Sequence, residues 1–434
     1  MTRPGYKMTE IGEIPEEWFC VKIGYPKVTR KMKAGGTPLK SIDNYYKNGK
    51  IPFVKIEDIV NSSKYLTRTL EFITDDGLNN SSTWLIPKNS ILFSMYASYG
   101  EVCINQIPVA TNQAIISIVP NKESVDVNFL YYELKNLKNS LKQYLRSTTQ
   151  KNLNAEIVKG LKIVLPPLPE QQKIAEILSS MDKAIQRLND QITQTGRIKK
   201  GLKQNLLTKG IGHSMFKATR IGKIPEEWNI KKLNDISTKI TDGTHITPHY
   251  LDFGIPFLRI TDIQSEKIDW DRVKRISLEE HKYLSKHCLP EENDILLSKN
   301  GTIGITKLVD WKIRTSIFVS LCLIKPDPKE VNSYFLSEYI SSKGMEQIFL
   351  RLKKLTVTNL HLIEIRNLMI PIPPIEEQME ISKILKSINE FELSLRNYRS
   401  KLNDLQLGLV QDLLTGKVRV NNLKGVINFN GNTV

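Results

Sequence analysis

The chain has 434 residues and a formal net charge of +16, with 62 Lys and Arg against 46 Asp and Glu. Hydrophobic residues make up 40% of it, which is enough for roughly two to four globular domains with cores of their own. It contains no run of ~18 apolar residues, which argues against a transmembrane helix, and its N-terminus lacks the apolar segment of a signal peptide. We therefore expect a cytoplasmic protein, and the positive charge predicts a polyanionic partner such as nucleic acid.

The cysteines predict neither a disulfide framework nor a zinc knuckle. They are far apart and form no Cys-x-x-Cys pair: Cys20, Cys103, Cys288 and Cys322. His281 and His287 lie near Cys288 and could ligate a metal, although unpaired surface residues are the commoner explanation. No cofactor is expected.

The chain opens with a segment that returns in its second half. Residues 11–18 read Ile-Gly-Glu-Ile-Pro-Glu-Glu-Trp, and residues 221–228 repeat them with one change. Self-similarity at so long a period indicates an internal duplication that covers nearly the whole chain. Each half then contains a strand-rich domain, a short helical segment and a long helix.

Within each half the strands agree and the loops differ. Residues 51–56 and 255–260 are strand-like, and residues 89–94 and 293–298 each predict a turn followed by a buried strand. The apolar spacing over residues 129–145 predicts an amphipathic helix. In the loops, by contrast, Gly-Gly-Thr-Pro in the first half faces Asp-Gly-Thr-His in the second. We predict two copies of one scaffold with two different recognition surfaces, although surface loops diverge in any duplicated domain.

A proline-flagged long helix ends each half. From Ile174 to Ile192 apolar residues recur at four–three spacing, and the pattern resumes at Leu202, which is typical of a coiled coil. About 38 residues at ~1.5 Å each make a rod of roughly 57 Å. The second rod has an entirely apolar seam: Ile384, Ile388, Phe391, Leu395, Tyr398, Leu402, Leu405 and Leu409. We expect the two rods to lie antiparallel and to bury these stripes against each other; two unrelated core helices are the alternative.

Catalytic motifs are missing from the sequence. It has no Asn-Pro-Pro-aromatic or Phe-x-Gly-x-Gly motif of adenine methyltransferases and no His-Glu-x-x-His. Gly196 and Gly201 have the spacing of a phosphate loop, but no Lys-Ser/Thr follows them. Glu133 and Lys135, with Asp126 upstream, are similar to a nuclease set, but neighbours two apart on a helix face different ways. We therefore expect structural roles for Gly196, Gly201, Asp126, Glu133 and Lys135.

Four motifs carry a resemblance to a known family. They are the proline block at residues 167–175, its second copy at 374–382, the paired Ile-Pro-Glu-Glu-Trp segments and Gly-Thr-Ile-Gly at 301–304. The chain resembles the specificity subunit of a type I restriction–modification system over essentially its whole length. The second block differs in that Glu replaces Pro and Met replaces Gln. The resemblance implies an α+β fold: two mixed α/β globular target recognition domains, separated by two long antiparallel coiled-coil helices, with a pseudo-two-fold internal repeat.

The same resemblance implies a function. Each target recognition domain would read one half of a bipartite sequence in double-stranded DNA, and the helices would set the spacing and dock two modification (methyltransferase) subunits. Restriction (endonuclease/translocase) subunits would join for cleavage, and this chain would perform no catalysis. We expect recognition domains at residues 1–165 and 211–370, spacer helices at 166–210 and 371–416, and a tail at 417–434. A single-chain restriction or modification enzyme with its own activity is the alternative, and a protein-binding coiled-coil adaptor is a weaker one.

The polar loops hold the residue types that read DNA. Lys and Arg neutralise phosphates, Asn and Gln match adenine edges, Arg and Lys match guanine, and Thr contacts the thymine methyl group. His245, with His249 nearby, is treated as a DNA contact and not as a metal ligand. The candidate contacts are Lys33, Thr37, Tyr96, Ser98, Tyr99, Arg146, Thr148, Thr149, Gln150, Lys151, Asn152, Asp242, Thr244, His245, Lys299, Asn300, Thr302, Lys353, Lys354, Thr356 and Thr358.

Overall fold

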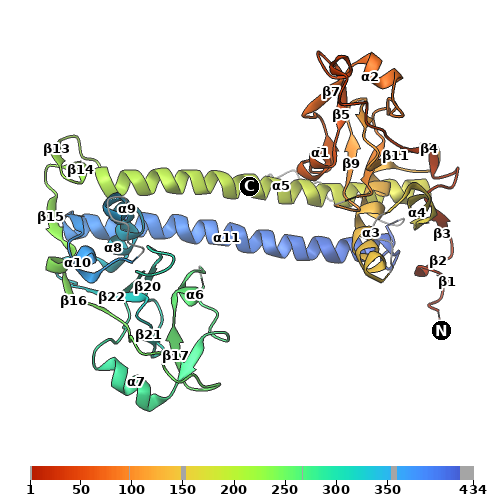
Figure 1. Cartoon of the computed structure of the whole chain (residues 1–434). Helices are drawn as coiled ribbons and strands as arrows, with labels where there is room; N and C mark the ends of the chain where they lie inside the picture. Colours follow the sequence, from red (N-terminus) through yellow and green to blue (C-terminus); the bar gives the residue numbers. More distant parts are fainter. Residues whose placement is uncertain (1, 97, 148–152, 266, 353–358, 421–434) are drawn as a thin grey trace, which may run out of the picture. The chain divides into compact units, whose positions relative to one another are not determined.

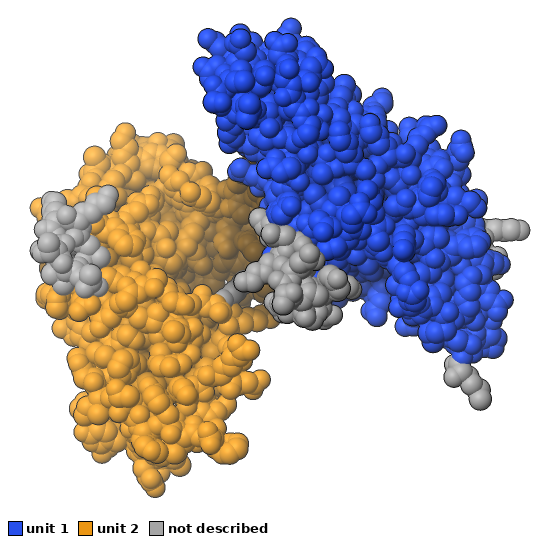
Figure 2. Space-filling view, turned by 45° about the vertical axis from the view of Figure 1, so that its right-hand side comes forward, with its two compact units in different colours: residues 1–189, 397–434 blue, residues 190–396 orange. Residues whose placement is uncertain are grey.

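The computed structural model describes residues 2–96, 98–147, 153–265, 267–352 and 359–420. The chain divides into two compact units, one made of residues 1–189 and 397–434 and the other of residues 190–396 (Figure 2). Each unit therefore combines one α/β domain with a section of both long helices. Among the described residues, no helix is both long and apolar enough to cross a membrane.

The main sheet of unit 1 has five strands in the order β4-β11-β8-β9-β6. In chain order these are β4 (Thr29–Ala34), β6 (Tyr65–Leu66), β8 (Ile91–Ser94), β9 (Val102–Asn105) and β11 (Ile115–Pro120). Strand β8, predicted from the sequence, is buried along its whole length because both faces of the sheet are covered. Ile91 and Phe93 belong to one core, whereas Leu92 belongs to a second core on the opposite face.

A smaller lobe covers the second face. Its sheet has the order β10-β5-β7, with β5 (Ile51–Val54), β7 (Glu71–Ile73) and β10 (Ala110–Thr111). Two short helices, α1 (Ile56–Asn61) and α2 (Asp75–Asn79), complete it. Helix α2 begins after Thr74 because the Thr74 hydroxyl accepts a hydrogen bond from the Gly77 amide at 3.1 Å. The strand predicted at residues 51–56 is confirmed as β5 over Ile51–Val54, but it ends earlier than predicted, because helix α1 begins at Ile56.

We call the α/β domains of units 1 and 2 domain 1 and domain 2, and the two ends of domain 1 meet beside the first long helix. Its first strands form a hairpin, and the next strand pairs antiparallel with the last one. These elements are β1 (Tyr6–Thr9), β2 (Gly12–Pro15), β3 (Phe19–Lys22), α3 (Val127–Ser147), α4 (Ala155–Gly160), β12 (Lys162–Leu165) and α5 (Leu168–Lys209). Helix α3 confirms the amphipathic helix predicted over residues 129–145, and its apolar face covers the main sheet.

Unit 2 repeats this topology with a four-stranded main sheet, β16-β22-β19-β20, which has no counterpart of β6 among the described residues, and with sheets β18-β17-β21, β15-β23 and the hairpin β13-β14. Its strands are β13 (Phe216–Thr219), β14 (Gly222–Pro225), β15 (Asn229–Lys232), β16 (Ser237–Asp242), β17 (Ile255–Leu258), β18 (Lys274–Ile276), β19 (Ile295–Ser298), β20 (Thr306–Leu308), β21 (Ser316–Ile317), β22 (Leu321–Pro326) and β23 (Met369–Ile372). Its helices are α6 (Ile260–Ile263), α7 (Leu278–Ser285), α8 (Ser333–Tyr339), α9 (Met345–Leu352), α10 (Leu362–Arg366) and α11 (Ile375–Leu414). A π-helical turn at Ile340–Gly344 joins α8 to α9, where unit 1 has the single helix α3.

Helices α5 and α11 are each continuous, and their sections pair antiparallel within each unit (Figure 1). In unit 1 the Gln406 side chain donates to Asp182 at 2.6 Å, and Arg399 donates to Asn189 at 3.5 Å. Residue numbers therefore rise along α5 as they fall along α11. In unit 2 the Lys199 ammonium meets the Glu392 carboxylate at 3.0 Å. The predicted fold class is confirmed: two mixed α/β domains, two long antiparallel helices and an internal repeat.

The predicted seam is confirmed on α5 and is wrong for much of α11. Leu188 and Ile192 on α5 are 5% and 8% exposed, whereas Phe391, Tyr398 and Leu405 on α11 are 55%, 56% and 52% exposed. In unit 2, α11 instead buries a row that packs into the domain core, which includes Ile381, Leu385 and Leu336 of α8. A helix that contacts both a partner helix and a domain has its buried face set by both, so a single apolar stripe does not identify that face.

Candidate nucleic-acid interface

Two loops of domain 1 leave the main sheet at the same edge. Strand β11 is antiparallel to both of its neighbours, so Ile116 pairs with Ala34 at the end of β4, and Ile115 pairs with Ser94 at the end of β8. The segments after β4 and β8 must therefore emerge on either side of the start of β11. We call residues 35–39, 95–100 and 111–114 the reading edge of domain 1; residue 97 is outside the described residues.

The candidate residues on this edge differ in exposure. The Thr37 hydroxyl donates to the Gln113 side-chain oxygen at 2.6 Å, and both residues are exposed. Tyr96 is 37% exposed, whereas Tyr99 packs partly into the core. The Ser98 carbonyl accepts a hydrogen bond from the Ser94 hydroxyl, which holds the loop against the end of β8. The edge therefore presents a hydroxyl, an amide and a phenol to solvent.

Sequence reasoning missed Gln113 and its neighbour Asn112. Both follow β10 in a short polar turn before the apolar strand β11, and Gln113 is exposed beside Thr37. An Asn-Gln pair between two apolar segments was the available signal, since these amides can match an adenine edge. It was passed over because nothing local places that turn beside the loop after β4.

Two glycines permit the close approach at this edge. A Cβ on Gly35 would lie 2.0 Å from the Thr111 carbonyl oxygen, and a Cβ on Gly243 would lie 2.1 Å from the Ile317 carbonyl oxygen. The Gly35 amide donates to Ile115, and the Gly243 amide donates to Leu321 in the corresponding place. These bonds make Gly35 the structural counterpart of Gly243.

The alignment by sequence, which set Gly36 against Gly243, is therefore wrong by one residue. Trp18 and Trp228 are 210 positions apart, but Gly35 and Gly243 are 208 apart, because the two domains differ in loop length between these points. As a consequence, the counterpart of Thr37 is His245 and not Thr244.

Domain 2 builds the same edge with an ion pair. The Lys299 ammonium lies 2.5 Å from an Asp242 carboxylate oxygen, and His245 Nε2 lies 3.6 Å from that same oxygen. Lys299 is 8% exposed, so in the free protein its charge is held inside the edge, whereas the His245 side chain is 73% exposed. The Thr244 hydroxyl is engaged with the backbone of Ile246. His245 is thus the side chain of this group that is presented to solvent.

The other candidates of domain 2 follow Lys299 directly. Asn300 is partly exposed and Thr302 is exposed, and the Thr302 carbonyl accepts from the Ser298 hydroxyl at 2.6 Å. The Leu360 amide donates to the Lys299 carbonyl at 2.8 Å, so the chain passes this edge immediately after the segment 353–358. We call residues 242–246, 299–304 and 317–320 the reading edge of domain 2.

Domain 1 has apolar residues at the positions of the Lys299–Asp242 ion pair. The Met95 amide donates to Ala114 as the Lys299 amide donates to Ser320, so Met95 is the counterpart of Lys299. Ala34 at the end of β4 stands where Asp242 stands at the end of β16. The interior of the reading edge of domain 2 therefore holds an ion pair, whereas the same place in domain 1 holds apolar side chains.

Several predicted contacts lie outside the described residues: Thr148, Thr149, Gln150, Lys151, Asn152, Lys353, Lys354, Thr356 and Thr358. The prediction that Arg146 lies in a polar loop is wrong, because helix α3 continues to Ser147 and Arg146 belongs to its last turn. Lys33 is exposed on the edge strand β4, near Arg30 and Lys31, which are also exposed. The Lys31 ammonium sits 4.1 Å from the centre of the Trp84 ring. Strand β4 therefore carries a row of cations beside the reading edge.

The residues weighed for nuclease chemistry have structural roles. An Asp126 carboxylate oxygen accepts the amides of Asn128 and Phe129 at 2.9 Å each, which caps α3. Glu133 is 5% exposed in the core, and burial raises its pKa to about 8. These two carboxyl groups are therefore not aimed at one site with Lys135.

The histidine weighed for metal binding is also part of a core. His281 is 4% exposed, and its Nδ1 lies 2.9 Å from the Ser316 hydroxyl. Burial, with a smaller effect of Arg314, lowers the pKa of His281. Over the described ranges, no group of three His, Cys, Asp or Glu side chains is placed to hold a metal ion.

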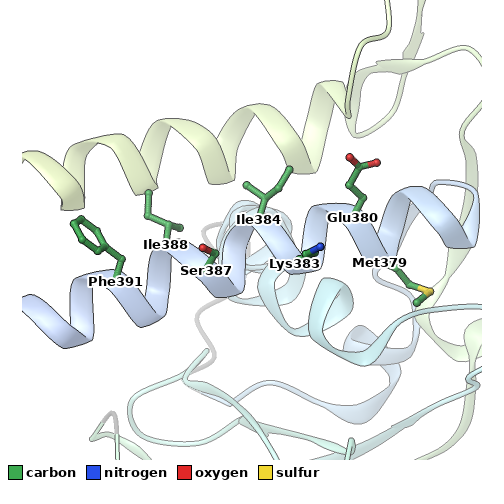
Figure 3. Close-up of a pocket in the computed structure, with 7 residues that line it drawn as sticks. All are labelled: Met379, Glu380, Lys383, Ile384, Ser387, Ile388 and Phe391. Atoms are coloured by element: carbon green, nitrogen blue, oxygen red, sulfur yellow. The ribbon is translucent and has the colours of Figure 1, made fainter.

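A second surface lies along α11 in unit 2 (Figure 3). A shallow groove of about 970 Å³ is lined by seven residues of this one helix: Met379, Glu380, Lys383, Ile384, Ser387, Ile388 and Phe391. Ile384 and Ile388 point toward α5, whereas Met379 and Phe391 are more than half exposed. Exposed apolar side chains on a charged helix mark a surface that another chain can cover.

Two domains of one topology, with different loops at the same sheet edge and two long helices, define a duplicated recognition scaffold. The family model for the type I restriction modification DNA specificity domain matches residues 15–195 and 225–402, and the chain belongs to this family. The family match thus confirms the resemblance that the residue motifs indicated.

Relatives match over nearly the full length. The MjaVIII specificity subunit of a type I restriction enzyme from Methanocaldococcus jannaschii is 28% identical, covering 94% of this chain and 95% of the relative. The EcoBI specificity subunit from Escherichia coli is 24% identical, covering 88% and 83%. The crystal structure of a type I restriction-modification S subunit from M. genitalium shares the fold, with a TM-score of 0.56, 17% identity and coverage of 95% and 99%.

Proposed function

We propose that this chain is the sequence-specific DNA-binding specificity subunit of a type I restriction–modification complex. Each domain, at residues 1–165 and 211–370, reads one half of a bipartite target in double-stranded DNA. The observation that carries the proposal is the pair of reading edges: two domains share one frame, yet Met95 and Ala34 in one are replaced by Lys299 and Asp242 in the other. Different side chains on one frame are what two different half-sites require.

The reading residues are proposed from chemistry and position. Thr37, Gln113 and Tyr96 in domain 1, and His245, Asn300 and Thr302 in domain 2, present hydroxyl, amide, ring or imidazole groups at the edges. The cations of β4, Lys33 among them, neutralise phosphates beside the first edge. Arg146, residues 148–152 and residues 353–358 supply further contacts. The last of these precede Leu360 in the chain, and the Leu360 amide donates to the Lys299 carbonyl at the second edge.

The helices at residues 166–210 and 371–416 set the distance between the half-sites. Helix α5 has 42 residues and helix α11 has 40, so each is about 60 Å long. Their antiparallel pairing is fixed by polar contacts in each unit, such as Gln406–Asp182 and Lys199–Glu392. A continuous paired helix resists bending more than a loop does, which suits it to hold a distance.

The groove and the exposed apolar residues of α11 dock the modification (methyltransferase) subunits. Phe391, Tyr398 and Leu405 would each lose water on such an interface, and the internal repeat favours two copies of the partner. Restriction (endonuclease/translocase) subunits then join the assembly. The chemistry resides in these partners. The alternative of a self-sufficient enzyme predicts methyl transfer or cleavage by the purified chain with DNA and labelled S-adenosylmethionine.

A domain exchange tests the modular reading. Residues 20–150 are replaced by those of a relative, the complex is reconstituted with its modification subunits, and methylated sites are mapped across a genome. We expect one half-site to change and the other to persist. A matched chimera with residues 230–357 exchanged should change the opposite half-site. Simultaneous change of both half-sites in either chimera contradicts the proposal.

A further inference from the structure

A buried polar cluster fastens domain 1 to both long helices. We call Lys64, Tyr132, Ser179, Asp182 and Gln406 the first node. The Tyr132 hydroxyl donates to one Asp182 oxygen at 2.5 Å, and Gln406 donates to the other at 2.6 Å. The Lys64 ammonium donates to Ser179 at 2.8 Å and to Tyr132 at 3.2 Å. Four segments far apart in the sequence therefore meet: the start of β6, α3, α5 and α11.

Formation of the node requires polar side chains to lose their contact with water, which an ordinary surface contact does not require. Lys64 is 7% exposed and Tyr132 is 3% exposed. The Lys64 ammonium also lies 4.4 Å from the centre of the Tyr132 ring and 5.3 Å from that of Tyr131. Burial lowers the pKa of Lys64 to about 8, and burial, with the Asp182 hydrogen bond, raises that of Tyr132. Removing one member of such a cluster leaves the others buried and unpaired.

Unit 2 has a cluster at the corresponding place. Asn389 on α11 donates to the Tyr334 hydroxyl at 2.6 Å, and Lys203 on α5 meets Glu338 at 2.6 Å and Ser341 at 2.7 Å. Gln171 and Gln378 lie at the start of α5 and α11, where their side chains donate to the carbonyls of Pro166 and Pro373. Asp182 and Asn389 each lie eleven residues after the glutamine of their own helix. We call Lys203, Tyr334, Glu338, Ser341 and Asn389 the second node.

The two nodes differ in where the acid stands. In the first node the carboxylate is on the long helix, at Asp182, and the domain helix supplies a phenol, at Tyr132. In the second node the carboxylate is on the domain helix, at Glu338, and the long helix supplies an amide, at Asn389. The duplication has therefore kept an attachment at this point while its chemistry changed, which indicates a selected role for the attachment itself.

The distance of the node from the helix start explains that role. Domain 1 is also attached where α5 begins, because Trp18 donates to Glu170 at 2.9 Å. Glu170 and Asp182 are twelve residues apart, about 18 Å along a helix. Near the start of α5 the domain core also packs on Ile174, Ala175 and Leu178. Asp182 lies beyond these residues, so the node holds the domain further along the helix and thereby fixes its angle.

We propose that Asp182 and Tyr132 are positioning residues that hold the first reading domain at a fixed angle on the helix pair, and so make the complex selective for one gap length between its half-sites. The inference rests on the proposed function, because the two helices can fix the distance between half-sites only when the domain that binds each half-site is rigidly attached to them. The second node, through Glu338 and Asn389, does the same for domain 2.

The test uses the full chain reconstituted with its modification subunits. Methylation rates are measured on duplexes with intact half-sites and the gap shortened or lengthened by one base pair. Asp182→Asn and Tyr132→Phe are compared with wild type and with Asp404→Asn, which removes an exposed acid from α11. Tyr132→Phe removes one oxygen and keeps the ring in the core, so this variant should still fold.

We expect wild type and Asp404→Asn to discriminate against altered gaps. The ratio of the methylation rate at the original gap to the rate at altered gaps should fall about tenfold or more in Asp182→Asn and Tyr132→Phe. The preference for the two half-site sequences should be unchanged. Glu338→Gln should do the same from the other side. Unchanged gap discrimination in variants that melt at a lower temperature would overturn the proposal, since the node would then serve stability alone. Failure of the proposed function is seen separately, as absence of sequence-dependent methylation by wild type.

Discussion

The indole nitrogen of Trp18 donates a hydrogen bond to a Glu170 carboxylate oxygen at 2.9 Å across 152 residues of sequence. Trp228 makes the same bond to Glu377, also at 2.9 Å. The two most recognisable repeated motifs, the Ile-Pro-Glu-Glu-Trp segment and the proline block, therefore hold each other. Their similarity between the halves has a structural cause: each pair closes its domain onto the start of a long helix.

The neighbouring glutamine completes this closure. Gln171 donates to the carbonyls of Ser124 and Pro166 and accepts the Asp126 amide. Gln378 makes the corresponding three bonds in unit 2. In unit 1 the carboxylate of Glu170 also receives the Arg419 guanidinium at 2.8 and 3.0 Å, so the last described segment of the chain takes part.

Replacement of Glu170 should therefore destabilise unit 1. Glu170→Ala leaves the Trp18 indole and the Arg419 guanidinium without their buried partner, and we expect a loss of roughly 2–5 kcal/mol. Urea unfolding followed by tryptophan fluorescence measures it. Glu17→Ala is the matched control, because Glu17 bonds the same Arg419 but its side chain is 66% exposed. An equal, small effect of both variants would contradict this account of the closure.

Glu133 should make stability depend on pH. Burial raises its pKa from 4.5 to about 8, so between these values the folded protein holds a proton that the unfolded chain releases. The stabilising contribution is complete below about pH 4.5 and is lost as the pH rises toward 8. The loss amounts to several kcal/mol at ~1.4 kcal/mol per pKa unit.

The measurement is the urea midpoint at pH 5.5 and at pH 7.5. We expect wild type to be less stable at pH 7.5, and Glu133→Gln to lose most of that difference because its amide does not ionise. A pH slope of the same size in Glu133→Gln would assign the effect to other groups.

Two glycines should respond oppositely to alanine. A Cβ on Gly35 would collide with the Thr111 carbonyl, so Gly35→Ala should lose more than about 1 kcal/mol and weaken reading of the first half-site. Gly196 lies within α5, and a new Cβ there would meet no atom within 4 Å beyond its chain neighbours and the backbone of its own helix, so Gly196→Ala should gain about 0.5–1 kcal/mol. Thermal unfolding and half-site methylation report both. A harmless Gly35→Ala would remove the close-approach argument for the edge.

DNA affinity should fall steeply with salt. The net charge of +16 and the cations of β4 favour phosphate contacts, and each neutralised phosphate contributes a slope of about −0.9 to log K against log salt. For roughly six contacts, affinity should drop about 10³-fold between 50 and 200 mM salt. Titration of labelled duplex by the reconstituted complex measures the slope, and a flat profile would count against the electrostatic account.

A matched lengthening of both helices should lengthen the gap. The contact between Arg399 and Asn189 places residues 190 and 397 close to one level of the helix pair. Four helix-forming residues inserted after Asp190, and four more after Asn397, add about 6 Å to each helix. At ~3.4 Å per base pair the preferred gap should grow by about one or two base pairs.

Both half-sites should stay the same in this double insertion. An insertion in only one helix should misalign contacts such as Gln406–Asp182 and destabilise the protein. An active double insertion that methylates only at the original gap would show that something other than these helices sets the distance.

The sequence by itself determined the elements and their duplication. Strand β8, helix α3 and the long helix α5 follow from the spacing of apolar residues, and the repeated tryptophan segment identified the second copy. These features depend on neighbours within a few residues of one another, so their pattern is legible along the chain. The candidate loop after β8 was also found, because it follows a predicted strand, whereas the loop after β4 was found because Gly-Gly-Thr-Pro differs there from Asp-Gly-Thr-His in the second half.

Only the tertiary structure decided which of these residues meet. It brought Gly35 against Thr111, held the Lys299 charge against Asp242, brought Gln113 beside Thr37 and left Phe391 exposed on a helix that was expected to bury it. Each of these facts joins segments far apart in the chain. Their contacts depend on how sheets and helices pack together, and packing depends on surfaces that no local spacing of residue types contains.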